Sequence, residues 1–402
     1  MPIVAILFLT AVNLLNYFDR YIVPAVEPTI TAEFALSNTQ AGYLVSAFVL
    51  GYFIFSPMFG FIGDRYDRRW IMAVGLIGWS AATAMTAIAT TVAGFGFSRV
   101  LVGVGEAGYG ALVPPYLKGR VANTADLNRA LSIFYVAVPV GAALGYVAGG
   151  QVAATFGWRD LFLLAAVPGV VLAFGFLVLR PESQKTHTVS KSEGAPAGFL
   201  AGIRLIMRSR VLLLVISGYV LNTFALNGVA AFVVRHGTSL GLSAAAASTS
   251  FGVILVITGL LGTLGGGFLG SRLAEATSDP VSSLMRFVAW STLIGVPFLV
   301  VCFLARTSGL FLGGCFLAEL LIFAGVAPLN SVIAARAPDG YGALTQGVTI
   351  FAIQLFGGFL GPVAIGALTD LTGSLALAMQ GTSVALLCSG YLWWRASRLI
   401  ER

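Results

Sequence analysis

The chain has 402 residues, of which 58% are hydrophobic and only 10% are charged. Water-soluble proteins have about a quarter of their residues charged, so this composition excludes an ordinary soluble domain. The formal net charge of +7 would suggest a nucleic-acid partner in a soluble protein, but here we expect Lys and Arg to mark membrane topology. We therefore predict an all-α integral membrane protein that crosses the bilayer repeatedly and binds no nucleic acid.

Twelve apolar stretches are long enough to cross the hydrocarbon core, which takes about 20 residues. In the first half they cover approximately residues 3–26, 40–63, 70–93, 95–117, 130–155 and 159–180. In the second half they cover approximately residues 211–234, 244–269, 287–305, 309–333, 341–367 and 374–394. The first stretch lacks a basic segment before it and carries Asp19 and Arg20, so we expect it to remain as a helix and not to be cleaved as a signal peptide.

The basic residues predict the orientation of these spans. Of the 23 Lys and Arg residues, Arg20 and Arg99 fall inside spans, and Arg159, Arg235 and Arg306 would face outward if both termini are cytoplasmic. The remaining 18 then lie on the cytoplasmic side, as the positive-inside rule requires. The sequence contains no Asn-x-Ser/Thr acceptor for glycosylation, which favours a bacterial cytoplasmic (inner) membrane.

A polar stretch rich in Ser, Lys, Pro and Gly, residues 181–198, separates the sixth span from the seventh. Residues 199–210 place apolar side chains on one side and arginines elsewhere, which is typical of a helix on the inner membrane surface, and an early start of span seven is the alternative. The predicted domains are an N-terminal six-helix bundle (1–180), a cytoplasmic linker with an interfacial helix (181–210) and a C-terminal six-helix bundle (211–402).

The two halves repeat one another. Asn16 in the first span has a counterpart in Asn222 of the seventh, within Leu-Asn-x-Phe in both places, and the segment 60–65 recurs as 267–272. Parallel repeats of this kind form two bundles with a substrate site at the midplane between them, and they work by alternating access. The second half has no counterpart to the charges of Asp19 and Arg20, so we infer that these charges are specialised for function.

Five ionisable residues fall inside predicted spans, where each charge costs about 2.5 to 3.5 kcal/mol and calls for a partner or a water-filled cavity. These are Asp19, Arg20, Arg99, Glu106 and Glu319. We predict that Glu106, assisted by Asp19, carries a coupling proton. The predicted substrate-binding residues are Arg20, Arg99, Asn16, Asn222 and Glu319. The alternative is that the four charges of the first half form a buried ion network that only holds the bundle together.

The loop after the second span contains the predicted gate. Its residues are Gly60, Gly63, Asp64, Arg65, Arg68 and Arg69. The two glycines allow close approach of helix backbones, and an aspartate is stabilised at the positive N-terminal end of a neighbouring helix. We therefore expect Asp64 to dock at the start of span eleven, near Tyr341. Simple anchoring on the positive inside would explain the arginines but not the Gly, Gly, Asp pattern.

The Gly-x-x-x-Asp-Arg-x-x-Arg-Arg loop, the twelve spans and the duplicated halves together resemble the major facilitator superfamily. Within it, residues 16–21 (Asn-Tyr-Phe-Asp-Arg-Tyr), 98–109 and 132–141 resemble the Spinster family. The resemblance implies twelve transmembrane helices in two six-helix bundles and a proton-linked exporter of sphingosine phosphate or lysophospholipids. The chain departs from the common loop pattern at Asp67, where many facilitators have Gly.

Other classes of membrane protein explain the sequence less well. A channel would need a continuous lining of like character, and an enzyme would need a catalytic constellation within the membrane. The chain has no Gly-x-x-x-x-Gly-Lys nucleotide loop, and its three cysteines, Cys302, Cys315 and Cys388, are not spaced for pairing or for a metal, so we expect no cofactor.

We predict a proton-coupled secondary active transporter, not an enzyme, for an amphiphilic lipid such as a lysophospholipid or a sphingoid phosphate. The alternatives are a proton-driven exporter of drugs or small organic solutes, and an uncoupled facilitator. The expected partners are the substrate, protons and membrane lipids, and we expect the protein to be a monomer.

Overall fold

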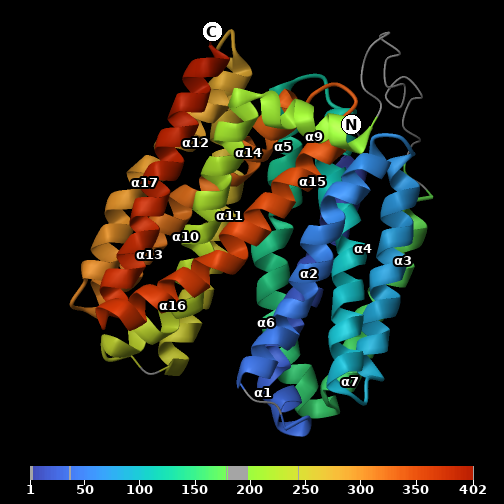
Figure 1. Cartoon of the computed structure of the whole chain (residues 1–402), viewed down its shortest axis with the longest axis vertical. Helices are drawn as coiled ribbons and strands as arrows, with labels where there is room; N and C mark the ends of the chain where they lie inside the picture. The colour runs from blue at the N-terminus through green and yellow to red at the C-terminus, as the bar shows by residue number, and fades with distance from the viewer. Residues whose placement is uncertain (1–2, 36–37, 178, 180–197, 243, 402) are drawn as a thin grey trace. The chain divides into compact units, whose positions relative to one another are not determined.

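The computed structural model describes residues 3–35, 38–177, 179, 198–242 and 244–401, which form helices and connecting turns without a β-strand (Figure 1). The helices of the first half are α1 (Ile3–Glu33), α2 (Asn38–Gly63), α3 (Arg68–Ala87), α4 (Val92–Lys118), α5 (Thr124–Tyr135), α6 (Ala137–Phe156) and α7 (Trp158–Gly175). Those that follow are α9 (Phe199–Arg208), α10 (Arg210–Ser239), α11 (Ala244–Glu275), α12 (Pro280–Leu304), α13 (Ser308–Ala324), α14 (Val326–Arg336), α15 (Gly342–Ala352), η1 (Ile353–Phe359), α16 (Leu360–Thr372) and α17 (Leu375–Ile400).

Each of the twelve predicted spans coincides with helix. In the described part of the chain, ten helical stretches are long and apolar enough to cross a membrane. The other two predicted spans correspond to α4 and to α2, whose described apolar part is the shorter helix Ala47–Gly63. The chain is therefore a multi-pass integral membrane protein, and the predicted all-α fold class is confirmed.

Three of the predicted spans are not regular α-helices. Span five divides at Val136 into α5 and α6, and span ten divides at Gly325 into α13 and α14. Pro139 and Pro328 lie just after these breaks, where their missing N–H leaves a carbonyl four residues earlier without its helical donor. Span eleven contains the π-helical segment η1. Span five also begins earlier than predicted, because the side chain of Asn123 caps α5 by accepting the N–H of Asp126 at 2.8 Å.

The helices group into two compact units that exchange short segments between the sequence halves. The first unit comprises Met1–Arg120, Ala137–Ile203 and Pro338–Phe351, and the second comprises Val121–Val136, Arg204–Ala337 and Ala352–Arg402. Helix α5 therefore belongs to the second unit and almost all of α15 to the first. The division into 1–180, 181–210 and 211–402 stays a prediction, and most of its linker, residues 181–197, lies outside the described residues.

In the first unit, α2 packs on α4, α1 packs on α6, and α3 lies between α4 and α7. The indole of Trp79 on α3 and the ring of Tyr109 on α4 are both fully buried and meet edge to face, with ring centroids 5.8 Å apart. The hydroxyl of Tyr109 donates a hydrogen bond of 2.5 Å to the carbonyl of Leu9 on α1. Tyr109 therefore ties α4 to α1, the two helices that carry the intramembrane charges of the first half.

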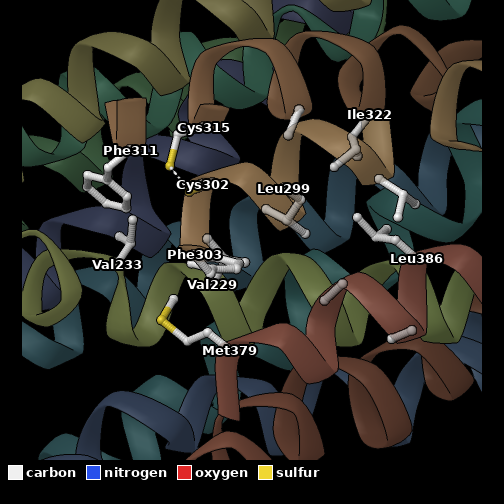
Figure 2. Packing of buried hydrophobic residues seen from close by; sticks show 14 of the residues in the cluster. Val229, Val233, Leu299, Cys302, Phe303, Phe311, Cys315, Ile322, Met379 and Leu386 are labelled. Carbon is white, nitrogen blue, oxygen red and sulfur yellow. Dashed lines mark hydrogen bonds between the residues drawn. The ribbon is translucent and has the colours of Figure 1, made fainter. Parts of the chain in front are cut away.

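In the second unit, α10, α12, α13 and α17 enclose an apolar core that includes Phe303, Phe311 and Met379 (Figure 2). The hairpin of α12 and α13 brings the Sγ atoms of Cys302 and Cys315 to 3.1 Å, a proximity that their sequence spacing did not indicate. Cys302 and Cys315 are buried in this core, whereas Cys388 is exposed.

The short helix α5 is attached to the second unit by a polar contact. The amide of Asn128, which is fully buried, donates hydrogen bonds to the carbonyl of Gly267 at 2.6 Å and to the hydroxyl of Ser271 at 3.0 Å, both on α11. Its side-chain oxygen accepts the hydroxyl of Ser331 on α14 at 3.3 Å. Asn128 thus joins a segment of the first sequence half to two helices of the second.

Helix α1 continues beyond the predicted end of its span to Glu33, whose carboxylate is held by the start of α7. Its Oε2 accepts the indole N–H of Trp158 at 2.6 Å, and its Oε1 pairs with Nη1 of Arg159 at 2.6 Å. These two hydrogen bonds, with the positive charge of Arg159, hold the pKa of Glu33 below its ordinary value. Because the pKa of Glu33 is lower in the folded than in the unfolded protein, its ionised carboxylate stabilises the fold at pH values above the unfolded pKa. This stabilisation is lost as the pH falls through the pKa of the folded state.

We predict that Glu33→Gln lowers the unfolding temperature of the purified protein slightly at pH 7, because an exposed ion pair contributes less than about 1 kcal/mol. The difference from the unmodified protein should begin to shrink as the pH falls below about 4, the ordinary range of a carboxyl, and should disappear only below the lowered pKa of folded Glu33. Thermal unfolding followed between pH 3.5 and pH 7, about the limits for a carboxyl titration, measures this. A difference that stays constant over that range would show that the charge of Glu33 contributes nothing.

Candidate functional site

The four charged residues predicted inside the spans of the first half come together between α1 and α4. Nε of Arg20 on α1 and Oε2 of Glu106 on α4 are 2.8 Å apart, and the Glu106 side chain is fully buried. Arg99 lies about two turns before Glu106 on the same face of α4. Its Nη2 donates to the main-chain carbonyl of Asp19 at 3.3 Å. The structure therefore places Asp19, Arg20, Arg99 and Glu106 in one cluster within the first unit.

Three aromatic rings surround the guanidinium of Arg20. Its central carbon lies 4.8 Å from the ring centroids of Tyr17 and Phe48 and 4.3 Å from that of Tyr52. Stacking on aromatic faces stabilises a cation that has left water. The sequence did not identify Phe48 and Tyr52 as site residues. They lie one helical turn apart on α2, but which face of α2 meets Arg20 depends on how the helix is rotated about its axis.

Several polar atoms of this cluster are buried without a hydrogen-bond partner among the described residues. They are both carboxylate oxygens of Asp19, Oε1 of Glu106 and Nη1 of Arg99. Buried polar groups are normally hydrogen-bonded, and an unpaired one costs about 1 to 3 kcal/mol. A network whose purpose was only to hold helices together would satisfy these atoms, so the arrangement favours a cluster that also binds a proton or an anionic ligand.

The two predicted site residues of the second half both lie in the second unit. Asn222 is on α10 and Glu319 is on α13, and each is 6% exposed. Oε2 of Glu319 lies 3.3 Å from the hydroxyl oxygen of Thr258 on α11. In the described part of the chain, no cation lies within ion-pair distance of Glu319.

Asp64 occupies the N-terminus of α15, a helix of the second sequence half that belongs to the first unit. Its two carboxylate oxygens accept the main-chain N–H groups of Ala343 and Leu344, each at 2.9 Å, and Oδ1 also pairs with Nη2 of Arg68 at 3.1 Å. These N–H groups belong to the first turn of α15, where an anion is favoured. Burial raises the pKa of the Asp64 carboxyl, and the two N–H groups and Arg68 act in the opposite direction.

The glycines of the loop allow this contact. A methyl group on Gly60 would overlap the carbonyl oxygen of Ala343, and one on Gly63 would overlap the side chain of Leu112. Close backbone approach, which needs glycine, brings α2 near enough to α15 for the short Asp64 side chain to reach the N–H groups. Figure 1 shows the two helices side by side at this end of the unit.

The remaining loop residues make local contacts. Asp67, the departure from the common pattern, caps α3 by accepting the N–H of Arg69 at 3.0 Å and pairs with the Arg69 guanidinium at 2.6 Å. Arg69 also donates to the carbonyl of Leu179 at 2.6 Å, and the guanidinium of Arg65 lies 3.4 Å from the ring centroid of Phe61. In this loop Asp67 therefore serves as the N-cap of α3.

Comparison with known proteins gives the family. The sequence model of the Major Facilitator Superfamily matches residues 9–362. Protein spinster of Drosophila melanogaster is 31% identical over 335 residues, which cover 79% of this chain and 53% of that protein, so the chain spans about half of its length. The "Probable sphingolipid transporter spinster homolog 1" of Arabidopsis thaliana is 28% identical over 379 residues, covering 81% of this chain and 74% of that protein.

Solved structures agree on the fold. A bacterial homologue of the human lysosomal transporter Spinster, in an inward-facing and unoccupied conformation, aligns over 98% of this chain and 97% of its own with a TM-score of 0.65 and 21% identity. The major facilitator transporter FucP, in an outward conformation, aligns over 100% and 99% with a TM-score of 0.80 and 14% identity. The resemblance to the major facilitator superfamily and to its Spinster family, predicted from sequence motifs, is confirmed.

We predict that Asp64→Asn weakens the contact between α2 and α15. Asparagine keeps one acceptor for the two N–H groups and turns a donor toward the other. Because burying the charge of Asp64 also has a cost, we expect a net loss of about 1 kcal/mol, which changes the population ratio about fivefold. Spin labels at the exposed positions Tyr66 and Asp339, in a protein without its native cysteines, should then report a second, longer distance.

The matched control is Asp67→Asn, which removes a charge from the same loop but keeps Asp64 and its hydrogen bonds to α15, and asparagine can still cap α3. Its distance distribution should equal that of the unmodified protein. The same distribution for Asp64→Asn would contradict a role for Asp64 in holding α15.

Proposed function

The chain belongs to the major facilitator superfamily, with Spinster proteins among its relatives, and we propose that it is a proton-coupled secondary transporter that works by alternating access. The superfamily is one of transporters, so the prediction that the chain is not an enzyme is confirmed. The observation that carries the proposal is the buried pair of Arg20 and Glu106, which lies beside the Asp19 carboxylate and its two unpartnered oxygens.

The cluster supports coupling by competition for Arg20. An ionised carboxylate inside the membrane is stable while it is paired, and Glu106 is paired with Arg20. A substrate with an anionic group binds the same guanidinium, and the carboxylate that it displaces takes a proton in place of the lost cation. Asp19, which lies beside Arg99, supplies a second carboxylate within the same cluster. Binding of the anion and binding of the proton then favour each other, which is the reciprocity that coupling requires.

We assign the substrate to the class of amphiphilic lipids with an anionic headgroup, such as lysophospholipids or sphingoid phosphates. Two relatives support this class by name as sphingolipid transporters. Arg20 and Arg99 provide cations for a phosphate, and the buried amide of Asn16 on α1 lies in the same cluster. Asn222 is its repeat counterpart on α10, and we assign it to the same substrate.

We further propose that the contact between Asp64 and α15 closes the cytoplasmic side during the cycle. In this assignment Gly60, Gly63, Asp64 and the arginines of the loop form the gate, and both termini face the cytoplasm of a bacterial cell. The 18 basic residues on that side support the orientation. We propose that the protein transports as a monomer, since one chain supplies both halves of the repeat.

We predict that Glu106→Gln, which mimics the protonated side chain, keeps substrate binding and counterflow exchange but loses accumulation driven by a pH gradient. Liposomes that contain the reconstituted protein measure both: counterflow is followed in liposomes loaded with substrate, and accumulation is followed after a pH step. Glu275→Gln, an exposed carboxylate at the end of α11, should leave accumulation unchanged. Accumulation that persists in Glu106→Gln would show that the coupling proton does not bind there.

We predict that Arg20→Ala weakens the binding of an anionic lysolipid by tenfold or more, because a charge-assisted hydrogen bond contributes about 1.5 to 3 kcal/mol. Binding of a zwitterionic lysolipid should fall less. Arg20→Lys, which keeps the charge but not the planar fork or the stacking, should lie between. Titration calorimetry with both lipids measures the two losses, and equal losses would identify Arg20 as a structural ion-pair residue.

A further inference from the structure

Glu319 is a carboxylate in the apolar interior of the second unit. It lies on α13 between Cys315, one turn earlier, and Ile322, which both belong to the apolar core drawn in Figure 2, and Ala318 beside it is fully buried. On the neighbouring α12, Gly295 faces Ala318 and Leu321 and contributes no polar side chain. These neighbours of Glu319 are therefore apolar and uncharged.

No charged group faces Glu319 from the helices packed on α13. In the described residues, the charged side chains of α11, α12 and α14 are Arg272, Glu275, Arg286 and Arg336. All four lie near the ends of their helices, and none is paired with Glu319. The titratable groups in the same apolar core are the thiols of Cys315 and Cys302, which contact each other, and the imidazole of His236 on α10, which packs on Phe311 two turns before Glu319. An ionised Glu319 would thus be a single buried charge without a counterion, which is strongly unfavourable.

The hydrogen bonds of Thr258 indicate which form Glu319 takes. A threonine hydroxyl has one hydrogen to donate and can accept as well. The hydroxyl of Thr258 lies 2.7 Å from the carbonyl of Ile254 and 3.3 Å from Oε2 of Glu319. The shorter contact assigns the single hydrogen of Thr258 to the carbonyl of Ile254, so the contact at 3.3 Å is a hydrogen bond only if the carboxyl of Glu319 donates.

We propose that Glu319 is a second proton-binding site, in which the side chain is a neutral carboxylic acid that donates its hydrogen to the hydroxyl oxygen of Thr258. The proton comes from the aqueous phase and returns to it when the carboxyl is hydrated. This assignment replaces the substrate contact predicted from the sequence for Glu319. It goes beyond the coupling assigned to Glu106, because its site lies in the other sequence half and has no arginine.

Infrared spectroscopy of the complete protein in liposomes tests the proposal without a transport measurement. Protein labelled with ¹³C at the glutamate carboxyl separates glutamic acid from aspartic acid, so Asp19 does not interfere. At pH 7, where an ordinary carboxyl is ionised, the labelled protein should show the carbonyl stretch of a protonated carboxylic acid. The band should shift in deuterated buffer, survive Glu106→Gln and disappear in Glu319→Gln.

Thr258→Val provides a second variant that keeps the carboxyl. With its acceptor removed, the acid band should move to higher frequency, as expected for a carboxyl without a hydrogen bond. A wild-type spectrum without the band, or a band that remains in Glu319→Gln, would overturn the proposal. A band that disappears in Glu319→Gln supports it even if Glu106→Gln still accumulates substrate, so a failure of the coupling assigned to Glu106 is read separately.

Discussion

The cost of placing a charge in hydrocarbon is the constraint on which the first unit depends. Four ionisable side chains lie on α1 and α4, and the Arg20–Glu106 bond satisfies one cation and one carboxylate oxygen between the two helices. The aromatic rings of Tyr17, Phe48 and Tyr52 replace part of the water that Arg20 has lost. Because these rings come from α1 and α2, the ion pair fixes the positions of three helices, and any ligand or proton that changes the pair acts on all of them.

The two halves of the repeat place different side chains at one equivalent position. Asp64 at the end of α2 corresponds to Ser271 near the end of α11, within matching Gly-x-x-Gly segments. Each of them holds a short helix from the opposite sequence half: Asp64 accepts N–H groups of α15, and the hydroxyl of Ser271 accepts the amide of Asn128 on α5 at 3.0 Å. The contact of Asp64 with α15 involves a charged carboxylate and is weakened if that carboxylate is protonated, whereas the contact of Ser271 with Asn128 is neutral. The repeat therefore supplies the geometry of two contacts, and the side chain decides which one is sensitive to charge.

The amino-acid sequence predicted what depends on local composition. Hydropathy and the distribution of basic residues placed the twelve spans, and the cost of buried charge singled out Arg20 and Glu106. The sequence could not show that Phe48 and Tyr52 enclose Arg20, or that Cys302 meets Cys315, because these contacts depend on how neighbouring helices are rotated about their axes. The division of spans five and ten was marked by Pro139 and Pro328, yet a proline inside a span also permits a continuous kinked helix. The geometry of packing decides between the two.

Glu106 and Glu319 show two different ways to bury a carboxyl group in a membrane. Glu106 meets Arg20 at 2.8 Å, so its charge is balanced within the helices that carry it. Glu319 has Thr258 as a polar neighbour at 3.3 Å, and no cation of the described residues lies within ion-pair distance, so in the neutral form proposed for it a proton replaces the counterion. The first arrangement responds to anything that competes for the arginine, and the second responds to hydration of the carboxyl itself. A transporter that has both can bind protons under two separate controls, one set by its substrate and one by the access of water.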